Sequence, residues 1–183
     1  MDKPTKINMM CGWRDFGSGW FNVDGGDYPH LHSKDILLED YPKDYADLIY
    51  CSHALEYFHP SYALNVLFPK WREVLKPGGI LRIAVPDFRQ MAILYTQGKY
   101  SLNHFLGPLY GEMGMGDEEI YHKTVYDEES LANVFEQNKF NNIELWDWRK
   151  VSHGKFDDHS QAYLPHMDKE NGVLISLNMQ GIK

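Results

Sequence analysis

Short apolar runs, each bounded by glycine, proline, aspartate or serine, recur along the first half of the chain. They cover residues 6–10, 20–23, 47–51 and 80–85, and this pattern is typical of buried strands. A run with fewer apolar positions, residues 31–36, gives the weakest of these strand predictions. Two further strand-like runs follow at residues 142–151 and 172–179. These two can pair as an antiparallel hairpin.

Helical periodicity separates these runs. The clearest helix places apolar side chains on one face at spacings of three and four, namely Leu64, Leu67, Phe68, Trp71 and Leu75. Pro69 lacks a backbone N–H, so we expect a kink or a fresh helix start there. The Lys-Pro-Gly-Gly turn at residues 76–79 then leads into the next strand.

A later helix is predicted to begin after Asp127, which is a favourable N-cap residue. Tyr126 and Leu131 are placed to form a hydrophobic staple across this cap. The buried face of the helix would carry Leu131, Val134 and Phe135.

Alternating strands and helices predict an α/β domain with a mainly parallel sheet. A chain of 183 residues fits one domain, because at this size folding buries about 70% of the surface that the unfolded chain exposes. We find no repeat or linker and treat residues 1–183 as one domain. Residues 152–171 are rich in Asp, His, Ser and Tyr, and a connection of that length is uncommon unless it is disordered or functional. They are a candidate lid or substrate loop.

Charge and composition exclude several classes. The net charge of −8 leaves no basic stripe for a phosphate backbone, so we expect no nucleic-acid partner. No apolar stretch approaches the roughly 18 residues of a membrane span, and no apolar run follows the N-terminus. Cys11 and Cys51 lie at strand ends and indicate no disulfide framework, which favours a cytoplasmic protein. The nine histidines lack a recognised ligand spacing, so we expect no metal. The oligomeric state is left open.

Candidate chemistry lies just after the predicted strands, because ligands of open α/β sheets bind beyond the carboxyl ends of the strands. Gly12 follows the first strand and allows a tight turn and close approach of the backbone to a ligand. Asp24 ends the second strand, at the position of a carboxylate that binds ribose hydroxyls. Only residues 13–19 separate these strands, so the first helix, and with it part of an anion-binding helix start, is expected to be missing. Taken alone, a plain turn and a surface acid explain Gly12 and Asp24 better than a ligand site.

Five segments in this order resemble the class I S-adenosylmethionine-dependent methyltransferases. They are residues 7–12 (Ile-Asn-Met-Met-Cys-Gly), 22–24 (Asn-Val-Asp), 47–50 (Asp-Leu-Ile-Tyr), 53–56 (His-Ala-Leu-Glu) and 75–79 (Leu-Lys-Pro-Gly-Gly). Each segment is weak alone, but their order and distances together are specific, and the resemblance covers residues 6–95. Residues 122–124 and 157–160 also resemble a small-molecule subgroup of the family. When Gly12 and Asp24 are considered together with the other segments, a cofactor site is the better interpretation of these two residues.

The resemblance implies a single-domain Rossmann-like fold with a mostly parallel seven-stranded sheet and an antiparallel last strand. It implies that S-adenosylmethionine binds over the first two strands and the acceptor above the fourth and fifth. It assigns the first-strand loop to Cys11 and Gly12, the ribose carboxylate to Asp24, the adenine side to Asp35 and Ile36, and the methionine end to Ser52 and His53.

The chain departs from the family at Met10, which stands where the family usually has its first glycine. We hypothesise that the Met10 side chain narrows the cofactor pocket. We also hypothesise that Arg14 compensates for the missing first helix by pairing with the cofactor carboxylate.

Methyl transfer from a sulfonium requires alignment of acceptor, methyl and sulfur, and positioning can supply much of the acceleration. A general base is needed only if the acceptor loses a proton, and the candidates are His122, Asp158, His159 and His166. His53 is expected to contact ligand without acting in catalysis. Glu56 is expected to cap or pair with the following helix.

The predicted function is methyl transfer from S-adenosylmethionine to a small polar acceptor, such as a sugar or related metabolite. An acidic, aromatic late segment would repel an anionic acceptor. One alternative is a catalytically silent S-adenosylmethionine-binding regulatory module, motivated by Met10 and the missing first helix. Another is a different nucleotide-dependent enzyme on a doubly wound sheet, but neither Gly-x-Gly-x-x-Gly nor a Gly-Lys-Ser/Thr loop occurs.

Overall fold

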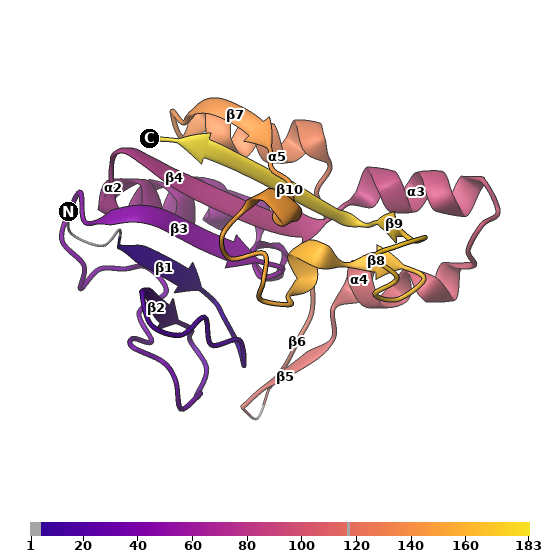
Figure 1. Ribbon diagram of the computed structural model, residues 1–183, viewed down its shortest axis with the longest axis horizontal. Coiled ribbons are helices and arrows are strands. Elements are labelled where there is room, and N and C mark those ends of the chain that lie inside the picture. Colours follow the sequence, from indigo (N-terminus) through magenta and orange to yellow (C-terminus); the bar gives the residue numbers. More distant parts are fainter. Residues whose placement is uncertain (1–4, 117) are drawn as a thin grey trace.

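The computed structural model describes residues 5–116 and 118–183, and its centre is a six-stranded sheet (Figure 1). The strands are β1 Lys6–Met9, β2 Trp20–Val23, β3 Ala46–Ser52, β4 Leu75–Pro86, β7 Asn141–Leu145 and β10 Ser176–Ile182. Their spatial order is β2-β1-β3-β4-β10-β7. β10 runs antiparallel to both of its neighbours, and the neighbouring strands from β2 to β4 are parallel to one another. The prediction of a mainly parallel sheet with an antiparallel last strand is confirmed.

The sheet has six strands in the described residues, one fewer than expected. Residues 31–36 make a single parallel bridge, between Val23 and Ser33, instead of a strand. The imidazole of His32 accepts the N–H of Asn22 at 3.1 Å. A side chain therefore takes a place that a neighbouring strand's backbone would fill, and the ladder does not extend beyond β2.

One face of the sheet packs against a helical segment that lies behind it in Figure 1. The segment consists of α1 Pro60–Tyr62, the π-helical turn η2 Ala63–Leu67 and α2 Phe68–Val74. The backbone stays helical where these elements join, because Leu67 and Phe68 both have right-handed helical φ and ψ. Pro69 therefore begins no separate helix, and the predicted fresh start is not seen. The π-helical turn η2 directly before Pro69 is the local departure from α-helical geometry at its missing N–H. Leu67, Phe68 and Trp71 are fully buried against the sheet.

The helix α5 Glu128–Gln137 packs beside α2 on the same face. Asp127 is its N-cap, as predicted, and accepts the N–H of Ser130 at 2.9 Å, while the Ser130 hydroxyl accepts the N–H of Asp127. Leu131, Val134 and Phe135 are buried, and Tyr126 joins the same core. The remaining helical elements are η1 Leu55–Tyr57, α3 Phe88–Thr96, η3 Leu102–His104, α4 Leu106–Tyr110, η4 Trp148–Lys150 and η5 His159–Gln161.

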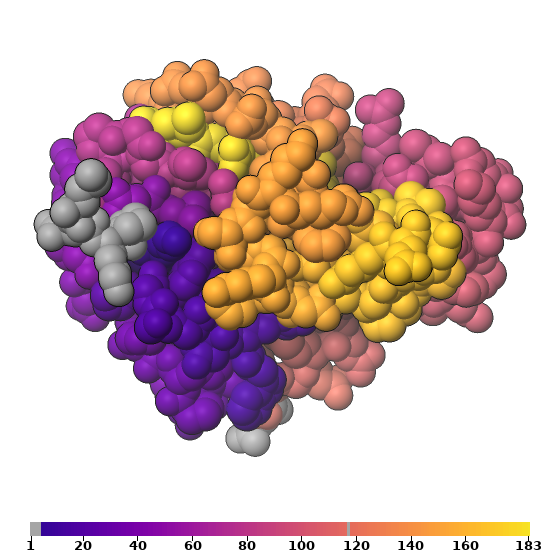
Figure 2. Space-filling model, in the orientation of Figure 1, coloured from indigo at the N-terminus to yellow at the C-terminus, as the bar shows by residue number. Residues whose placement is uncertain are grey.

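The opposite face of the sheet is covered by aromatic side chains on loops. No helix lies between β1 and β2 in the described chain, as the short spacing predicted. Phe16 and Trp20 instead pack with Tyr50 and Trp146. Figure 2 shows the later residues, in orange and yellow, lying over the centre of this face. The high aromatic content therefore fills a layer that helices would otherwise occupy.

The first and last residues of the late strands differ from those predicted. The run at residues 142–151 leaves the sheet at Leu145, and the Trp146 indole turns inward to donate to the Ile83 carbonyl at 3.1 Å. The run at residues 172–179 breaks at Ile175 into β9 Val173–Leu174 and β10. The predicted antiparallel pairing of the two runs is confirmed between β7 and β10. Residues 76–79 lie within β4, where the register against β3 shifts.

Residues 152–171 are more structured than a bare connection. They contain η5 and the strand β8 Tyr163–Leu164, which pairs with β9. The Tyr50 hydroxyl donates to the Asp158 carboxylate at 2.7 Å, and the Asn178 amide donates to the Ser160 carbonyl at 2.9 Å. These bonds fasten the segment to β3 and β10. A second small pair, β5 Met113–Met115 and β6 Glu118–Ile120, projects below the sheet in Figure 1. Within the described residues, no helix is long and apolar enough to cross a membrane.

Candidate functional site

A cavity of about 1000 Å³ opens at the carboxyl ends of β1, β2 and β3. This is the edge at which open α/β sheets bind ligands. Met10, Gly12, Asp24 and His53, which directly follow these strands, line one side. The other side comes from the segments around α4, the β5–β6 pair and residues 158–167.

The cavity brings together most of the residues that the sequence singled out. Those expected to contact the cofactor that lie in its wall are Cys11, Gly12, Arg14, Ile36, Asp24, Ser52 and His53. All of the acid–base candidates lie there too, namely His122, Asp158, His159 and His166. Asp35 does not line the cavity. Its carboxylate accepts the N–H groups of Leu37 and Asp40 at 3.0 and 2.9 Å and so stabilises its own turn.

Asp24 joins the ends of β1 and β2 through its side chain. One carboxylate oxygen accepts the Gly12 N–H at 2.8 Å and the other accepts the Gly26 N–H at 2.7 Å. Gly12 has a φ of +53°, a backbone conformation that glycine adopts readily. Because a carboxylate offers about four acceptor positions, Asp24 can still accept hydrogen bonds from two ligand hydroxyls. Its 6% exposure keeps it fixed at the cavity edge.

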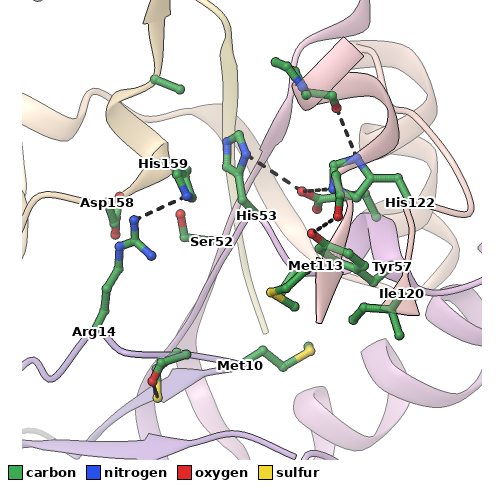
Figure 3. Close-up of a pocket in the computed structure, with 18 of the residues that line it drawn as sticks. Met10, Arg14, Ser52, His53, Tyr57, Met113, Ile120, His122, Asp158 and His159 are labelled. Atoms are coloured by element: carbon green, nitrogen blue, oxygen red, sulfur yellow. Dashed lines mark hydrogen bonds and ion pairs between the residues drawn. The ribbon is translucent and has the colours of Figure 1, made fainter. Parts of the chain in front are cut away.

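Met10 and His53 leave their strands in the same left-handed conformation, with φ values of +50° and +48°. This region is costly for residues with a side chain, and such outliers cluster at functional sites. Met10 is half-buried and borders the cavity (Figure 3). With this side chain in place the cavity measures about 1000 Å³.

Arg14 reaches toward the late segment (Figure 3). Its Nη2 lies 3.3 Å from Nε2 of His159, and its Nε donates to the Asp157 carbonyl at 3.3 Å. In the described chain no carboxylate forms an ion pair with the guanidinium. Arg14 can therefore offer a charge-assisted, two-pronged contact to an anionic ligand group.

Glu56 is the feature that sequence reasoning missed. It lies in η1 with 1% exposure, and in the described structure neither carboxyl oxygen has a hydrogen-bond partner. Its Oε1 is 3.8 Å from Nδ1 of His53 and 3.7 Å from Nε2 of His122. Burial raises the pKa of the Glu56 carboxyl from 4.5 to about 8. The expected role as a helix cap or ordinary ion pair is wrong.

Glu56 ends one of the five segments that carry the family resemblance, residues 53–56, but nothing in the sequence shows that its side chain is buried. It stands three residues after His53, a spacing equally common on surfaces, and its second histidine neighbour is 66 positions away in the chain. The buried cluster depends on the fold bringing β3 and the β5–β6 pair together. Burial also lowers the pKa of His53 well below 6.5, and lowers the pKa of His122.

His122 is held from several sides. Its Nδ1 lies 3.1 Å from the Pro108 carbonyl, and the Tyr57 ring packs edge-on at 4.5 Å between centroids. The Tyr57 hydroxyl donates to the Gly111 carbonyl (Figure 3). The imidazole therefore has one orientation toward Glu56. Among the described residues, no group of three or more histidine, cysteine or acidic side chains is arranged to hold a metal ion.

A family model described as a methyltransferase domain matches residues 14–145 of the chain. No curated protein sequence matches.

Solved structures share the fold at low identity. A SAM-dependent methyltransferase from Archaeoglobus fulgidus is 13% identical with a TM-score of 0.57, covering 98% of this chain and 86% of that one. One from Methanosarcina mazei is also 13% identical with a TM-score of 0.57, covering 100% and 94%. The 1,6-didemethyltoxoflavin-N1-methyltransferase of Burkholderia thailandensis, solved with 1,6-didemethyltoxoflavin and S-adenosylhomocysteine, is 12% identical with a TM-score of 0.54, covering 98% and 71%.

Proposed function

Because the chain belongs to the methyltransferase domain family and is an S-adenosylmethionine-dependent methyltransferase, we propose that it transfers the methyl group to a small polar acceptor, such as a sugar or related metabolite. The acceptor would be held between the cofactor residues and Glu56. We further propose that residues 1–183 form one domain and that residues 152–171 act as a lid over the acceptor.

The observation that carries this proposal is the single cavity that runs from Asp24 to His122. At about 1000 Å³ it stands at the upper end of the range of roughly 300–1000 Å³ for small-molecule sites. It has hydrogen-bonding groups for a nucleoside at one end and titratable groups at the other. This division supports a cofactor and an acceptor side by side.

The residues present fit S-adenosylmethionine, which when bound supplies an electrophilic methyl group on a positively charged sulfur. Asp24 would accept the ribose hydroxyls, and Arg14 would pair with the methionine carboxylate. Met10 and Ile36 offer apolar surface for the adenine side, where Asp35 does not reach the cavity. Ser52 and His53 would border the methionine end and orient the reacting carbon toward the acceptor.

Two further observations favour a small polar acceptor. The Burkholderia thailandensis relative is named for methylation of 1,6-didemethyltoxoflavin, a small molecule. The chain's net charge is −8, which disfavours nucleic acid and other polyanions.

The alternative of a catalytically silent cofactor-binding module rests on Met10 and on the missing helix between β1 and β2. The cavity is open beside Met10, which supports cofactor binding, a property that both candidates share. Turnover separates the two, because a silent module binds S-adenosylmethionine without transferring its methyl group.

The test is calorimetric titration of the protein with S-adenosylmethionine and S-adenosylhomocysteine, with NAD as the control. Selective binding of the first two supports the proposal. The second stage is incubation with methyl-labelled S-adenosylmethionine and a panel of sugars, amines and phenols. Binding with label transferred to none of the panel favours the silent module, and binding of neither compound contradicts the proposed site.

A further inference from the structure

The orientation of His53 follows from a chain of hydrogen bonds behind it. The Asn178 amide nitrogen donates to the Ser160 carbonyl, so its oxygen faces Ser176 and accepts the Ser176 hydroxyl at 2.9 Å. The Ser176 oxygen then accepts from Nε2 of His53 at 2.9 Å. Neutral His53 therefore carries its proton on Nε2, and its Nδ1 presents a lone pair to Glu56.

His122 also turns a nitrogen lone pair toward Glu56, but a different hydrogen-bond partner fixes its orientation. The Pro108 carbonyl can only accept, so the 3.1 Å contact places the proton of neutral His122 on Nδ1. Its Nε2 then presents a lone pair toward Oε1 of Glu56 at 3.7 Å. Both histidines are neutral near pH 7, because burial lowers the pKa of each below 6.5.

The groups that face one another around Glu56 therefore include more hydrogen-bond acceptors than donors. The histidine nitrogens contribute two lone pairs and the carboxyl group adds its own oxygens, while the cluster holds one proton at most. Both separations exceed hydrogen-bonding distance. The other titratable groups near the carboxyl are Cys51, Tyr57 and Tyr126, which are neutral at pH 7 because burial raises the pKa of each. Donors of the described chain near the carboxyl are its own backbone N–H and the Tyr126 hydroxyl, which is itself buried without a hydrogen-bond partner. Buried polar groups of native proteins are normally satisfied, so a donor that enters from the cavity would complete this cluster.

We propose that Glu56 is a catalytic residue that accepts a hydrogen bond, and then the proton, from a hydroxyl or amine N–H of the methyl acceptor. The inference rests on the proposed function and deepens it, since it restricts the acceptor to a nucleophile that carries a proton. Glu56 lines the same cavity as Ser52 and His53, at the end expected to face the methyl group. Both of its carboxyl oxygens are closed to solvent in the structure, so the hydroxyl or N–H of the acceptor reaches them only when a neighbouring side chain shifts.

The transfer balances within the cluster. An acceptor lone pair forms the bond to the methyl carbon, and the carbon–sulfur bond breaks with its electron pair left on sulfur. The acceptor's proton moves to the ionised Glu56 carboxylate. The positive charge lost from sulfur is balanced by the negative charge lost from the carboxylate, and solvent takes this proton as the product leaves.

The other acid–base candidates are already engaged. Asp158 accepts the Tyr50 hydroxyl and the Ser160 N–H. His159 lies beside the Arg14 guanidinium, and His166 is exposed. Glu56 differs from them because it is buried and unpaired in the described chain.

The test uses protein saturated with S-adenosylhomocysteine and matched probe pairs, in which one member can donate a hydrogen bond. The pairs are phenol and anisole, cyclohexanol and methoxycyclohexane, and aniline and N,N-dimethylaniline. Binding is measured by NMR, with the Glu carboxyl carbons labelled, for the wild type, Glu56→Gln and Glu136→Gln. Glu136 is exposed on α5, so its variant controls for the loss of one acidic charge.

We expect the donor member of at least one pair to bind more tightly than its partner and to shift the Glu56 carboxyl signal. Glu56→Gln should lose this preference by about tenfold, while Glu136→Gln retains it. Affinity for S-adenosylhomocysteine should change by less than about threefold in both variants, which also shows that they are folded.

If the wild type does not bind S-adenosylhomocysteine, the proposed function itself is contradicted, and the role of Glu56 falls with it. With that binding intact, absence of any donor preference across the panel overturns the role of Glu56. Equal donor preference in Glu56→Gln and the wild type overturns it as well. So does a donor effect that appears only when a divalent metal is added.

Discussion

Gly111 and His122 are in direct contact, and a β-carbon on Gly111 would overlap the His122 imidazole. Gly111 ends α4 with a φ of +53°. The Tyr57 hydroxyl holds its carbonyl, so the backbone cannot easily withdraw. A residue without a side chain is therefore required for His122 to face Glu56.

Gly111→Ala is expected to displace His122 and lower the free energy of unfolding by about 2–4 kcal/mol, from left-handed strain and overlap together. Gly98→Ala is the matched control, because Gly98 has a φ of +67° but an added β-carbon would meet nothing within 4 Å. It should cost about 1 kcal/mol. Urea unfolding measures the change in the free energy of unfolding for both variants. Equal losses in the two variants would contradict the overlap with His122.

Asp24→Asn should weaken binding of S-adenosylhomocysteine about 10- to 100-fold. The substitution removes a charged acceptor and places an amide N–H₂ against one of the two backbone N–H groups that Asp24 now accepts. Asp27→Asn is the control, because that side chain is almost fully exposed. Calorimetry gives the affinities. Unchanged affinity in Asp24→Asn would remove the ribose assignment.

Arg14→Gln should weaken the binding of one of two ligands that contain the same nucleoside and leave the binding of the other unchanged. We expect S-adenosylhomocysteine to bind about tenfold more weakly, because the variant loses the charge that pairs with its carboxylate. Binding of 5′-methylthioadenosine, which has no carboxylate, should be unchanged. Both dissociation constants come from calorimetry. An equal loss for the two ligands would place Arg14 away from the carboxylate.

The sequence predicted those parts of the fold that depend on local pattern. Apolar runs located five of the six sheet strands, although β4 begins at Leu75 where residues 80–85 were predicted, and β7 ends at Leu145 where residues 142–151 were predicted. Asp127 located the start of α5. The sixth strand was predicted with its neighbour β9 as one run, because Ile175 looks like any other strand residue. The expected edge strand was wrong, because His32 satisfies Asn22 through its side chain. Such a side-chain hydrogen bond does not change the periodic pattern of apolar and polar residues, so the sequence pattern does not reveal it.

The site was predicted where residues directly follow strands, as with Gly12, Asp24 and His53. It was missed where chemistry depends on long-range packing. Glu56 becomes a buried, unpaired acid only because His122 returns to it from beyond α4. Asp35 was misplaced in relation to the cavity, because its turn with Leu37 and Asp40 directs the carboxylate to its own backbone.

The stability of the wild type is expected to be highest near pH 7. Above about pH 7.5 the histidines are neutral in both states, while Glu56 has a folded pKa of about 8 and an unfolded pKa near 4.5. The folded chain keeps a proton that the unfolded chain has lost, so the free energy of unfolding falls with rising pH by up to about 1.4 kcal/mol per unit until pH 8.

Below about pH 7 the sign of the net slope reverses. Burial lowers the pKa of His53, His122, His153 and His159, that of His153 to about 3, so the unfolded chain binds protons on these imidazoles that the folded chain does not bind. Urea unfolding between about pH 5 and 8.5 tests both limbs. Glu56→Gln should keep the rise in stability on the acidic side and lose the decline above about pH 7. A decline that persists in the variant would assign it to another group.

Tyr50→Phe should loosen residues 152–171 without disturbing the sheet. The change removes the hydroxyl that donates to the buried Asp158 carboxylate at 2.7 Å, and a buried acceptor left short of a donor costs about 1–3 kcal/mol. Amide exchange in residues 152–171 should therefore accelerate by roughly 5- to 100-fold, while β3 and β4 stay protected. Tyr45→Phe is the control, because the structure records no hydrogen bond from that hydroxyl. Equal exchange in both variants would mean that the segment is held mainly by its aromatic contacts with Phe16 and Trp146, and a lid that opens would then have to break those contacts.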